Sequence, residues 1–352
     1  MNNKILIIVL YFIIPLILSG CNSSEGAKLN KNAIKLSTTQ YTNRITNLVK
    51  ADTLKPAILD TLLYKKLILH LVHDSASKYW PVPSAYPLPG AILPFKRIIA
   101  YYGNFYTANM GILGMQPEDT MLARLATEVK KWKEADTLIP TIPAIHYICV
   151  TAQGKPGKNS KYRMRMPPEQ IEHALVLAKK IKGIVFLDVQ VGWSTVQDEI
   201  PLLENYLKLP NVHLAIDPEF SMKESGRAPG TIIGTYDAAD LNYVTEYLAK
   251  LVKDYHLPPK VFVVHRFTKG MVTNYKEIVL RPEVQIVMDM DGWGFPAKKV
   301  SSYVLAEVKE PVQFTGFKLF YKNDILTPPW KTVMKPADVL KLYPSPIYIQ
   351  YQ

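Results

Sequence analysis

Alternating apolar and polar positions recur along the chain and predict short strands separated by amphipathic helices. The stretch 212–219 shows the pattern most clearly, because Val212, Leu214 and Ile216 fall on one face of a strand. The opposite face ends in two acids, Asp217 and Glu219. A strand that is apolar along its length and acidic at its carboxyl end is typical of parallel α/β barrels, which build their sites there.

The same pattern repeats eight times after residue 95. Strands are predicted over 97–105, 141–152, 183–192, 212–220, 260–267, 284–294, 314–321 and 346–351. Helices are predicted over 117–135, 167–182, 196–209, 237–256, 274–280, 297–308 and 336–342. Eight alternating units over about 255 residues indicate an α/β fold, a closed (β/α)₈ TIM barrel. An open doubly wound sheet shares the alternation, but no nucleotide-binding glycine motif follows any strand.

The first 94 residues predict three further segments. Residues 1–20 read as a signal peptide, 21–39 as a flexible tether and 40–94 as an N-terminal cap. The cap combines an apolar helix over 56–73 with a proline-rich extended arm over 80–94. The barrel domain is then expected to span 95–352.

A lipid-attachment motif ends the predicted signal peptide. Lys4 precedes an apolar run over 5–18, and the run ends in Leu18-Ser19-Gly20-Cys21. This sequence resembles the lipobox of bacterial lipoproteins, which implies cleavage before Cys21 and acylation of that residue, including palmitate. We therefore expect an exported protein anchored by lipid to a membrane of the bacterial cell envelope. The alternative is an N-terminal anchor that is not cleaved.

The overall composition indicates a folded chain with a large core. Of its 352 residues, 48% are hydrophobic and 20% are charged, and the formal net charge is +12. The basic residues are scattered and form no nucleic-acid motif, so we expect no nucleic-acid partner. Cys149 lies in an apolar run and is expected in the core. We expect a monomer that has no cofactor and no metal.

Polar and aromatic residues gather at the predicted carboxyl ends of the strands. If the strands are parallel, these side chains meet at one mouth of the barrel. Burying so many unpaired charges would be costly, so they either pair with one another or meet solvent in a cleft. The set comprises Tyr102, His146, Asp188, Gln190, Trp193, Asp217, Glu219, His265, Arg266, Asp289, Asp291, Trp293, Lys318, Tyr321 and Gln350.

Acids beside aromatic rings are suited to carbohydrate chemistry. Glycoside hydrolysis needs one protonated and one ionised carboxyl group across the scissile bond. We predict Glu219 as general acid and Asp291 as base or nucleophile, with Asp217 and Asp289 as further catalytic candidates. A poly- or oligosaccharide substrate would be bound by Tyr102, Asp188, Gln190, Trp193, His265, Arg266, Trp293, Lys318, Tyr321 and Gln350.

The lipobox, the barrel pattern and two strand ends, Phe186-Leu187-Asp188-Val189-Gln190 and Ala215-Ile216-Asp217-Pro218-Glu219, resemble the glycoside-hydrolase-like TIM-barrel lipoproteins of bacterial envelopes. The chain departs from the chitinase-type pattern Asp-x-x-Asp-x-Asp-x-Glu. Gln190 stands where the catalytic Glu would be, and Lys318 ends the seventh strand where retaining barrels carry a carboxylate. The resemblance therefore does not imply the chitinase mechanism for this chain.

Two other functions are compatible with the same residues. A metal-dependent hydrolase or phosphodiesterase could use the ligand types present in His146, Asp188, Asp217, Glu219, His265 and Asp289. A non-catalytic surface lipoprotein could bind glycan through the aromatic residues, while the acids form a structural ion network.

Overall fold

A closed ring of eight parallel strands forms the centre of the protein in a computed structural model, which describes residues 58–352. β1 pairs with β2 on one side and with β11 on the other, so the ring is closed and the predicted (β/α)₈ barrel is confirmed. The barrel strands are β1 (Arg97–Gly103), β2 (Thr141–Ala152), β4 (Ile184–Val189), β5 (Val212–Ile216), β7 (Lys260–Arg266), β9 (Val284–Met290), β10 (Phe314–Leu319) and β11 (Tyr348–Tyr351). β3 (Arg163–Arg165) extends β2 antiparallel, and β6 (Tyr236–Asp237) pairs with β8 (Val272–Thr273).

The predictions made for residues 1–57 lie outside the described residues. They concern the signal peptide, the lipidation of Cys21, the tether over 21–39 and the first part of the cap. Across residues 58–352, no helix combines the length and the apolar character needed to cross a bilayer.

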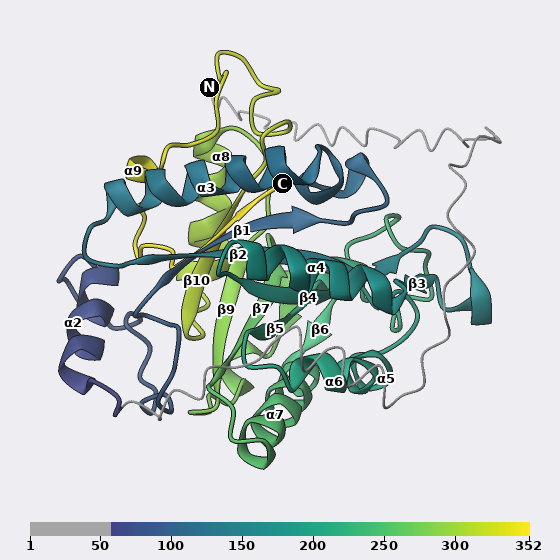
Figure 1. Ribbon diagram of the computed structural model, residues 1–352, viewed down its shortest axis with the longest axis horizontal. Helices are drawn as coiled ribbons and strands as arrows, with labels where there is room; N and C mark the ends of the chain where they lie inside the picture. The colour runs from purple at the N-terminus through teal and green to yellow at the C-terminus, as the bar shows by residue number, and fades with distance from the viewer. Residues whose placement is uncertain (1–57) are drawn as a thin grey trace, which may run out of the picture. The chain divides into compact units, whose positions relative to one another are not determined.

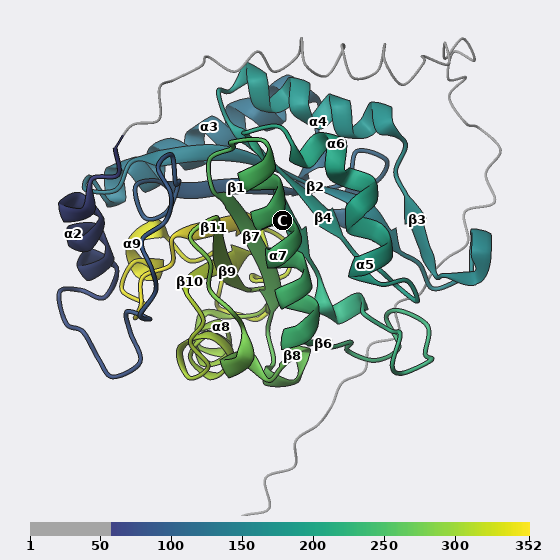
Figure 2. The same ribbon diagram turned by 90° about the horizontal axis from the view of Figure 1, so that it is seen from below.

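Helices cover the outside of the ring, as Figures 1 and 2 show. The longer ones are α3 (Glu118–Ala135), α4 (Pro168–Lys180), α7 (Ala238–Asp254) and α8 (Pro296–Tyr303), and α8 continues as the π-helix η8 (Val304–Val308). α9 (Pro336–Val339) is a single turn. The short 3₁₀ turns are η1 (Ala108–Met110), η2 (Ile112–Gly114), η3 (Lys158–Ser160), η5 (Pro218–Phe220) and η6 (Lys269–Met271).

Two predicted helices differ from the structure. The helix predicted over 196–209 is divided into α5 (Val196–Glu199), η4 (Ile200–Leu203) and α6 (Glu204–Leu207), because Pro201 has no N–H to donate. The helix predicted over 274–280 is only the 3₁₀ turn η7 (Tyr275–Glu277). There the Asn242 side chain of α7 accepts from Val279 N and donates to Glu277 O, at 2.8 and 2.9 Å, in place of helical hydrogen bonds.

The amino-terminal end of the barrel is closed by α2 (Thr61–Leu71) and the segment that follows it. Leu67, Leu71 and Leu93 belong to the same buried cluster as the first inward residues of the strands. Gln285 of β9 points down into this layer, accepts from the backbone N–H groups of Ile92 and Leu93 at 3.0 Å each, and donates to Leu93 O. Within the described residues, this end of the barrel is therefore closed by packed side chains.

The strands alternate as the sequence predicts. Ala215 of β5 lies in the core of the ring, so His213 and Asp217 share its inward face while Val212 and Leu214 face the helices. Cys149 is buried, as expected, and its thiol donates to Asp188 O at 3.3 Å.

Candidate functional site

A layer of buried polar side chains lies across the barrel toward the carboxyl ends of its strands. Each strand, or the residue just after it, contributes one side chain. Every member has an exposed fraction of 3% or less. This follows from the period of two, which turns alternate residues of every parallel strand toward the inside of the barrel. The layer consists of Tyr102, His146, Asp188, Asp217, His265, Asp289, Lys318 and Gln350.

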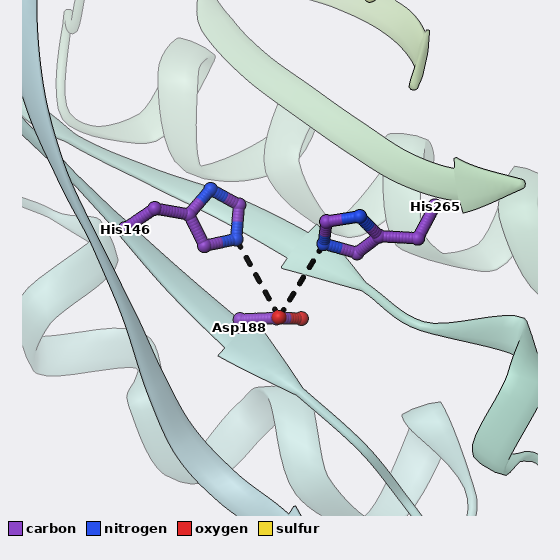
Figure 3. Close-up of side chains that lie close together, drawn as sticks. All are labelled: His146, Asp188 and His265. Carbon is purple, nitrogen blue, oxygen red and sulfur yellow. Dashed lines mark ion pairs between the residues drawn. The ribbon is translucent and has the colours of Figure 1, made fainter. Parts of the chain in front are cut away.

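Asp188 lies between two histidines at the centre of this layer (Figure 3). Its Oδ2 atom is 3.5 Å from Nε2 of His146 and 3.4 Å from Nε2 of His265. All three side chains are fully buried. Among the described residues, neither oxygen of Asp188 and neither of these Nε2 atoms has a hydrogen-bond partner of ordinary geometry.

The other ring nitrogen of each histidine faces a second set of polar groups. Nδ1 of His265 lies 3.3 Å from Oδ2 of Asp289 and 3.3 Å from Oδ2 of Asp291. Nδ1 of His146 lies 2.6 Å from the hydroxyl of Tyr348, and the side-chain amide of Gln350 is 3.1 Å away. Each imidazole therefore presents only Nε2 to Asp188.

The charges of this cluster act on one another strongly. Burial lowers the pKa of His146 to about 4, although Asp188 acts in the opposite direction. Burial alone would lower the pKa of His265, but Asp188, Asp289 and Asp291 together raise it well above its usual value. Burial would raise the pKa of Asp188, and the two histidines instead hold it below the usual range of a carboxyl group.

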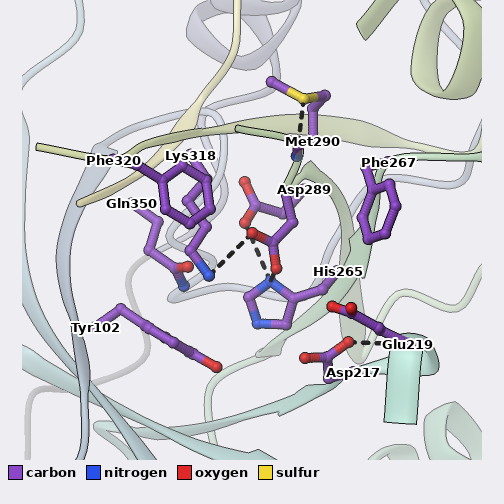
Figure 4. Close-up of polar contacts among 12 residues, drawn as sticks. Tyr102, Asp217, Glu219, His265, Phe267, Asp289, Met290, Lys318, Phe320 and Gln350 are labelled. Atoms are coloured by element: carbon purple, nitrogen blue, oxygen red, sulfur yellow. Dashed lines mark hydrogen bonds and ion pairs between the residues drawn. The ribbon is translucent and has the colours of Figure 1, made fainter. Parts of the chain in front are cut away.

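Lys318 connects the cluster to the carboxylate of Asp291, which follows β9. Its Nζ atom lies 3.0 Å from Oδ1 of Asp291 and 3.8 Å from the centre of the Tyr102 ring. Figure 4 shows Lys318 and His265 directed toward the centre of the site. Asp291 is therefore ion-paired with two different strands, β10 and β7.

Glu219 and Asp217 occupy the opposite side of His265 in the same view (Figure 4). Asp217 caps η5, since its Oδ1 atom accepts from Glu219 N at 3.0 Å. Burial and the negative charge of Asp291 raise the pKa of Glu219 to about 7, while Lys318 and His265 act to lower it. Burial and the nearby carboxyl groups raise the pKa of Asp217 well above its usual value, against the charge of His265.

Two residues predicted to bind substrate face away from the mouth, and for them the expected placement is wrong. Arg266 directly follows His265, so it points out of the barrel, where it pairs with Glu310 and donates to Ala306 O at 3.1 Å. Tyr321 also lies outside the ring, stacked on Tyr351 with ring centres 5.1 Å apart.

The two tryptophans of the prediction lie in the loops at the rim. Trp193 packs on Tyr162, with ring centres 4.5 Å apart, and donates to Arg227 O at 2.7 Å. Trp293 is 46% exposed and is covered on one face by Lys298, whose Nζ atom is 4.6 Å from the ring centre.

The remaining predicted residue, Gln190, is a buried connection within the site. Its side-chain amide donates to the Tyr102 hydroxyl at 3.3 Å, and its oxygen accepts from Ala152 N at 3.1 Å. Sequence reasoning missed Tyr348, which holds His146. The available signal was its position two residues before Gln350, on the same inward face of β11.

Comparisons with known proteins do not assign the chain to a family. No family model matches the chain, and no curated protein matches it. Among solved structures the chain is similar to GH26C from Muricauda sp. MAR_2010_75, with 11% identity, 82% of this chain and 81% of that chain covered, and a TM-score of 0.32. A similarity of this size carries no argument about function. The barrel itself is established by the strand pairing.

Proposed function

We propose that the chain hydrolyses glycosidic bonds of a poly- or oligosaccharide at the mouth of the barrel, with Glu219 as general acid and Asp291 as base or nucleophile. The observation that carries the proposal is the difference between the environments of these two carboxyl groups. Glycoside hydrolysis requires one carboxyl to keep its proton while the other is ionised in the same site.

Glu219 has the properties expected of the acid. It is only partly buried, so a substrate can reach it, and its pKa is raised to about 7 by burial and by Asp291. A general acid works best when its pKa lies near the working pH, because it is then protonated and still able to give up the proton.

Asp291 has the contacts expected of the ionised partner. The Lys318 ammonium lies 3.0 Å and the His265 ring 3.3 Å from its carboxylate oxygens. Asp289 lies on the other side of His265 and is buried, so we assign it to positioning the imidazole. Asp217, which holds the backbone of Glu219, is assigned to positioning the acid.

The rim supplies surfaces on which a sugar ring could stack. Trp293 follows Asp291 by two residues and is half exposed, so we propose that it contacts the sugar next to the scissile bond. Trp193 would contact a more distant sugar. Tyr102 is 3% exposed and its ring is covered by Lys318, so we assign it to the support of the site.

The test is turnover of a polysaccharide panel by the wild-type chain and by the variants Glu219→Gln and Asp291→Asn. We expect each variant to lose activity by at least about 100-fold. Glu224→Gln is the matched control, because its side chain is 88% exposed and pairs only with Lys223 at 3.9 Å. Wild-type turnover in either site variant would contradict the proposal. Glycan binding without turnover by the wild type would also contradict it and indicate a non-catalytic binding protein.

We also propose that the chain is anchored to a bacterial envelope membrane through lipid on Cys21. The proposal is supported by Lys4, the apolar run over 5–18 and the lipobox-like end of that run. Cells grown with labelled palmitate should incorporate label into the wild type and into Cys149→Ala, and none into Cys21→Ala. Incorporation into Cys21→Ala would refute the anchor.

A further inference from the structure

We propose that His146, Asp188 and His265 form a binding site for Zn²⁺ inside the barrel, near the carboxyl ends of the strands. Each residue offers one ligand atom, and the three atoms lie within 4.8 Å of one another. The ligand atoms are ones that neither Glu219 nor Asp291 supplies, but His265 also contacts Asp291, so a bound ion would act on the glycosidase site through that contact.

Two of the three ligand separations match the edges of a tetrahedral site, and all three lie within 4.8 Å. Zinc binds imidazole nitrogen and carboxylate oxygen at about 2.0–2.2 Å, so adjacent tetrahedral ligands are separated by about 3.4 Å. Oδ2 of Asp188 lies 3.5 Å from Nε2 of His146 and 3.4 Å from Nε2 of His265. A direct charge-assisted hydrogen bond between these atoms would be about 2.7–2.9 Å long. The observed spacing is therefore too wide for such a bond and fits an ion between the atoms.

The outer nitrogens face polar groups, as the second nitrogen of a metal-bound histidine does. A ligating histidine usually gives its second ring N–H to a carboxylate or another acceptor, which fixes the ring and leaves the opposite nitrogen for the metal. Nδ1 of His265 faces Asp289 and Asp291, and Nδ1 of His146 faces the Tyr348 hydroxyl at 2.6 Å. Both Nε2 atoms and both oxygens of Asp188 are buried without a hydrogen-bond partner of ordinary geometry in the described part of the chain. Such a set of buried groups calls for an ion or water.

The charge of the surroundings also favours a divalent cation. Three carboxylates, those of Asp188, Asp289 and Asp291, meet in this layer. If both histidines are neutral, as metal binding requires, the ammonium of Lys318 is the cation that lies in direct contact with these acids among the described residues. A doubly charged cation would neutralise the excess negative charge of the three carboxylates over the ammonium. Two imidazoles and one carboxylate suit Zn²⁺, and three protein ligands leave one position for water or substrate.

The experiment measures zinc bound to the full chain, purified in detergent, stripped with a chelator and dialysed against Zn²⁺. We expect one zinc per chain in the wild type and less than a tenth of that in Asp188→Asn. His173→Gln is the matched control, because His173 also pairs with a carboxylate, Glu118 at 2.8 Å, but has no third ligand. It should keep the full zinc content.

Two further measurements keep the test decisive if Asp188→Asn does not fold. The wild type loaded with Co²⁺ should show the visible absorption of a tetrahedral ion. Asp289→Asn, which changes only a group behind His265, should weaken zinc affinity by about 10–100-fold. Less than stoichiometric zinc in the wild type, or an octahedral cobalt spectrum, would overturn the proposal. Unchanged zinc in a folded Asp188→Asn would do so as well. None of these readouts depends on glycoside hydrolysis.

Discussion

Lys318 and Asp291 form an ion pair of 3.0 Å that joins the end of β10 to the loop after β9. Both side chains are less than a tenth exposed, at 2% and 9%. Removing one partner of a buried pair leaves an uncompensated charge, which costs about 3–5 kcal/mol. Lys318→Met should therefore lower the free energy of unfolding by about 3 kcal/mol in denaturant titration. Lys341→Met is the control, since its pair with Asp338 is exposed and should contribute less than about 1 kcal/mol.

The activity of the wild type should decline as the pH rises through about 7. The reason is that Glu219 must be protonated to act as an acid, and its pKa is about 7. Asp291 raises this pKa, whereas Lys318 and His265 lower it. A pH profile of kcat/KM should show a descending limb near 7, and in any residual activity of Lys318→Met the limb should move to higher pH. Full activity at pH 9 would exclude Glu219 as the acid.

Glu307 should make the fold less stable at alkaline pH. Burial raises its pKa to about 8, with Asp289 and Glu310 acting in the same direction and Arg266 against them. Within residues 58–352 neither of its carboxylate oxygens has a hydrogen-bond partner. A carboxyl whose pKa is raised by folding stabilises the protein below its unfolded pKa, and this contribution is lost as the pH rises toward 8.

Glu307→Gln removes that titration. Between pH 5 and pH 9, the wild type should lose about 2–4 kcal/mol more unfolding free energy than this variant. Glu134→Gln serves as the control, because its side chain is 64% exposed. If the unfolding free energies of the wild type and Glu307→Gln change equally with pH, the folded protein does not raise the pKa of Glu307.

The lower end of the barrel should depend on Gln285. Its oxygen satisfies the backbone N–H groups of Ile92 and Leu93 at 3.0 Å each. Gln285→Leu keeps the volume but leaves the buried N–H of Leu93 and the partly buried N–H of Ile92 unpaired, at about 1–3 kcal/mol for a buried donor. We expect a loss of about 2–4 kcal/mol in unfolding free energy and faster amide exchange at Leu93. Unchanged exchange there would mean that the segment is held by packing alone.

Trp293 should contribute to substrate affinity and little to stability. Aromatic stacking contributes about 0.5–1.5 kcal/mol beyond the buried area, so Trp293→Ala should raise KM about 2–10-fold with kcat nearly unchanged. Trp330→Ala is a comparable control, because Trp330 is 42% exposed against 46% for Trp293. An equal effect of both variants would indicate a nonspecific change.

The sequence predicts the strands well because their alternation is strict and their polar residues come last. Adjacent residues of a strand face opposite sides, so His265 and Arg266 cannot both point into the barrel, and parity would have placed Arg266 outside. The connection between β7 and β9 could not be foreseen, because the side chain of Asn242, far away in sequence, binds its backbone. The convergence of His146 and His265 on Asp188 likewise arises from three different strands.

The alternation of His265 and Arg266 gives β7 two separate tasks, one on each side of the barrel wall. Inserting or deleting a single residue within this strand would exchange the sides on which the two residues lie. The guanidinium would then face Asp188, and the imidazole would face the carbonyl of Ala306. Natural variation in length should therefore be confined to the loops that follow the strand. The number of residues within it is set by two polar networks that must both stay in register.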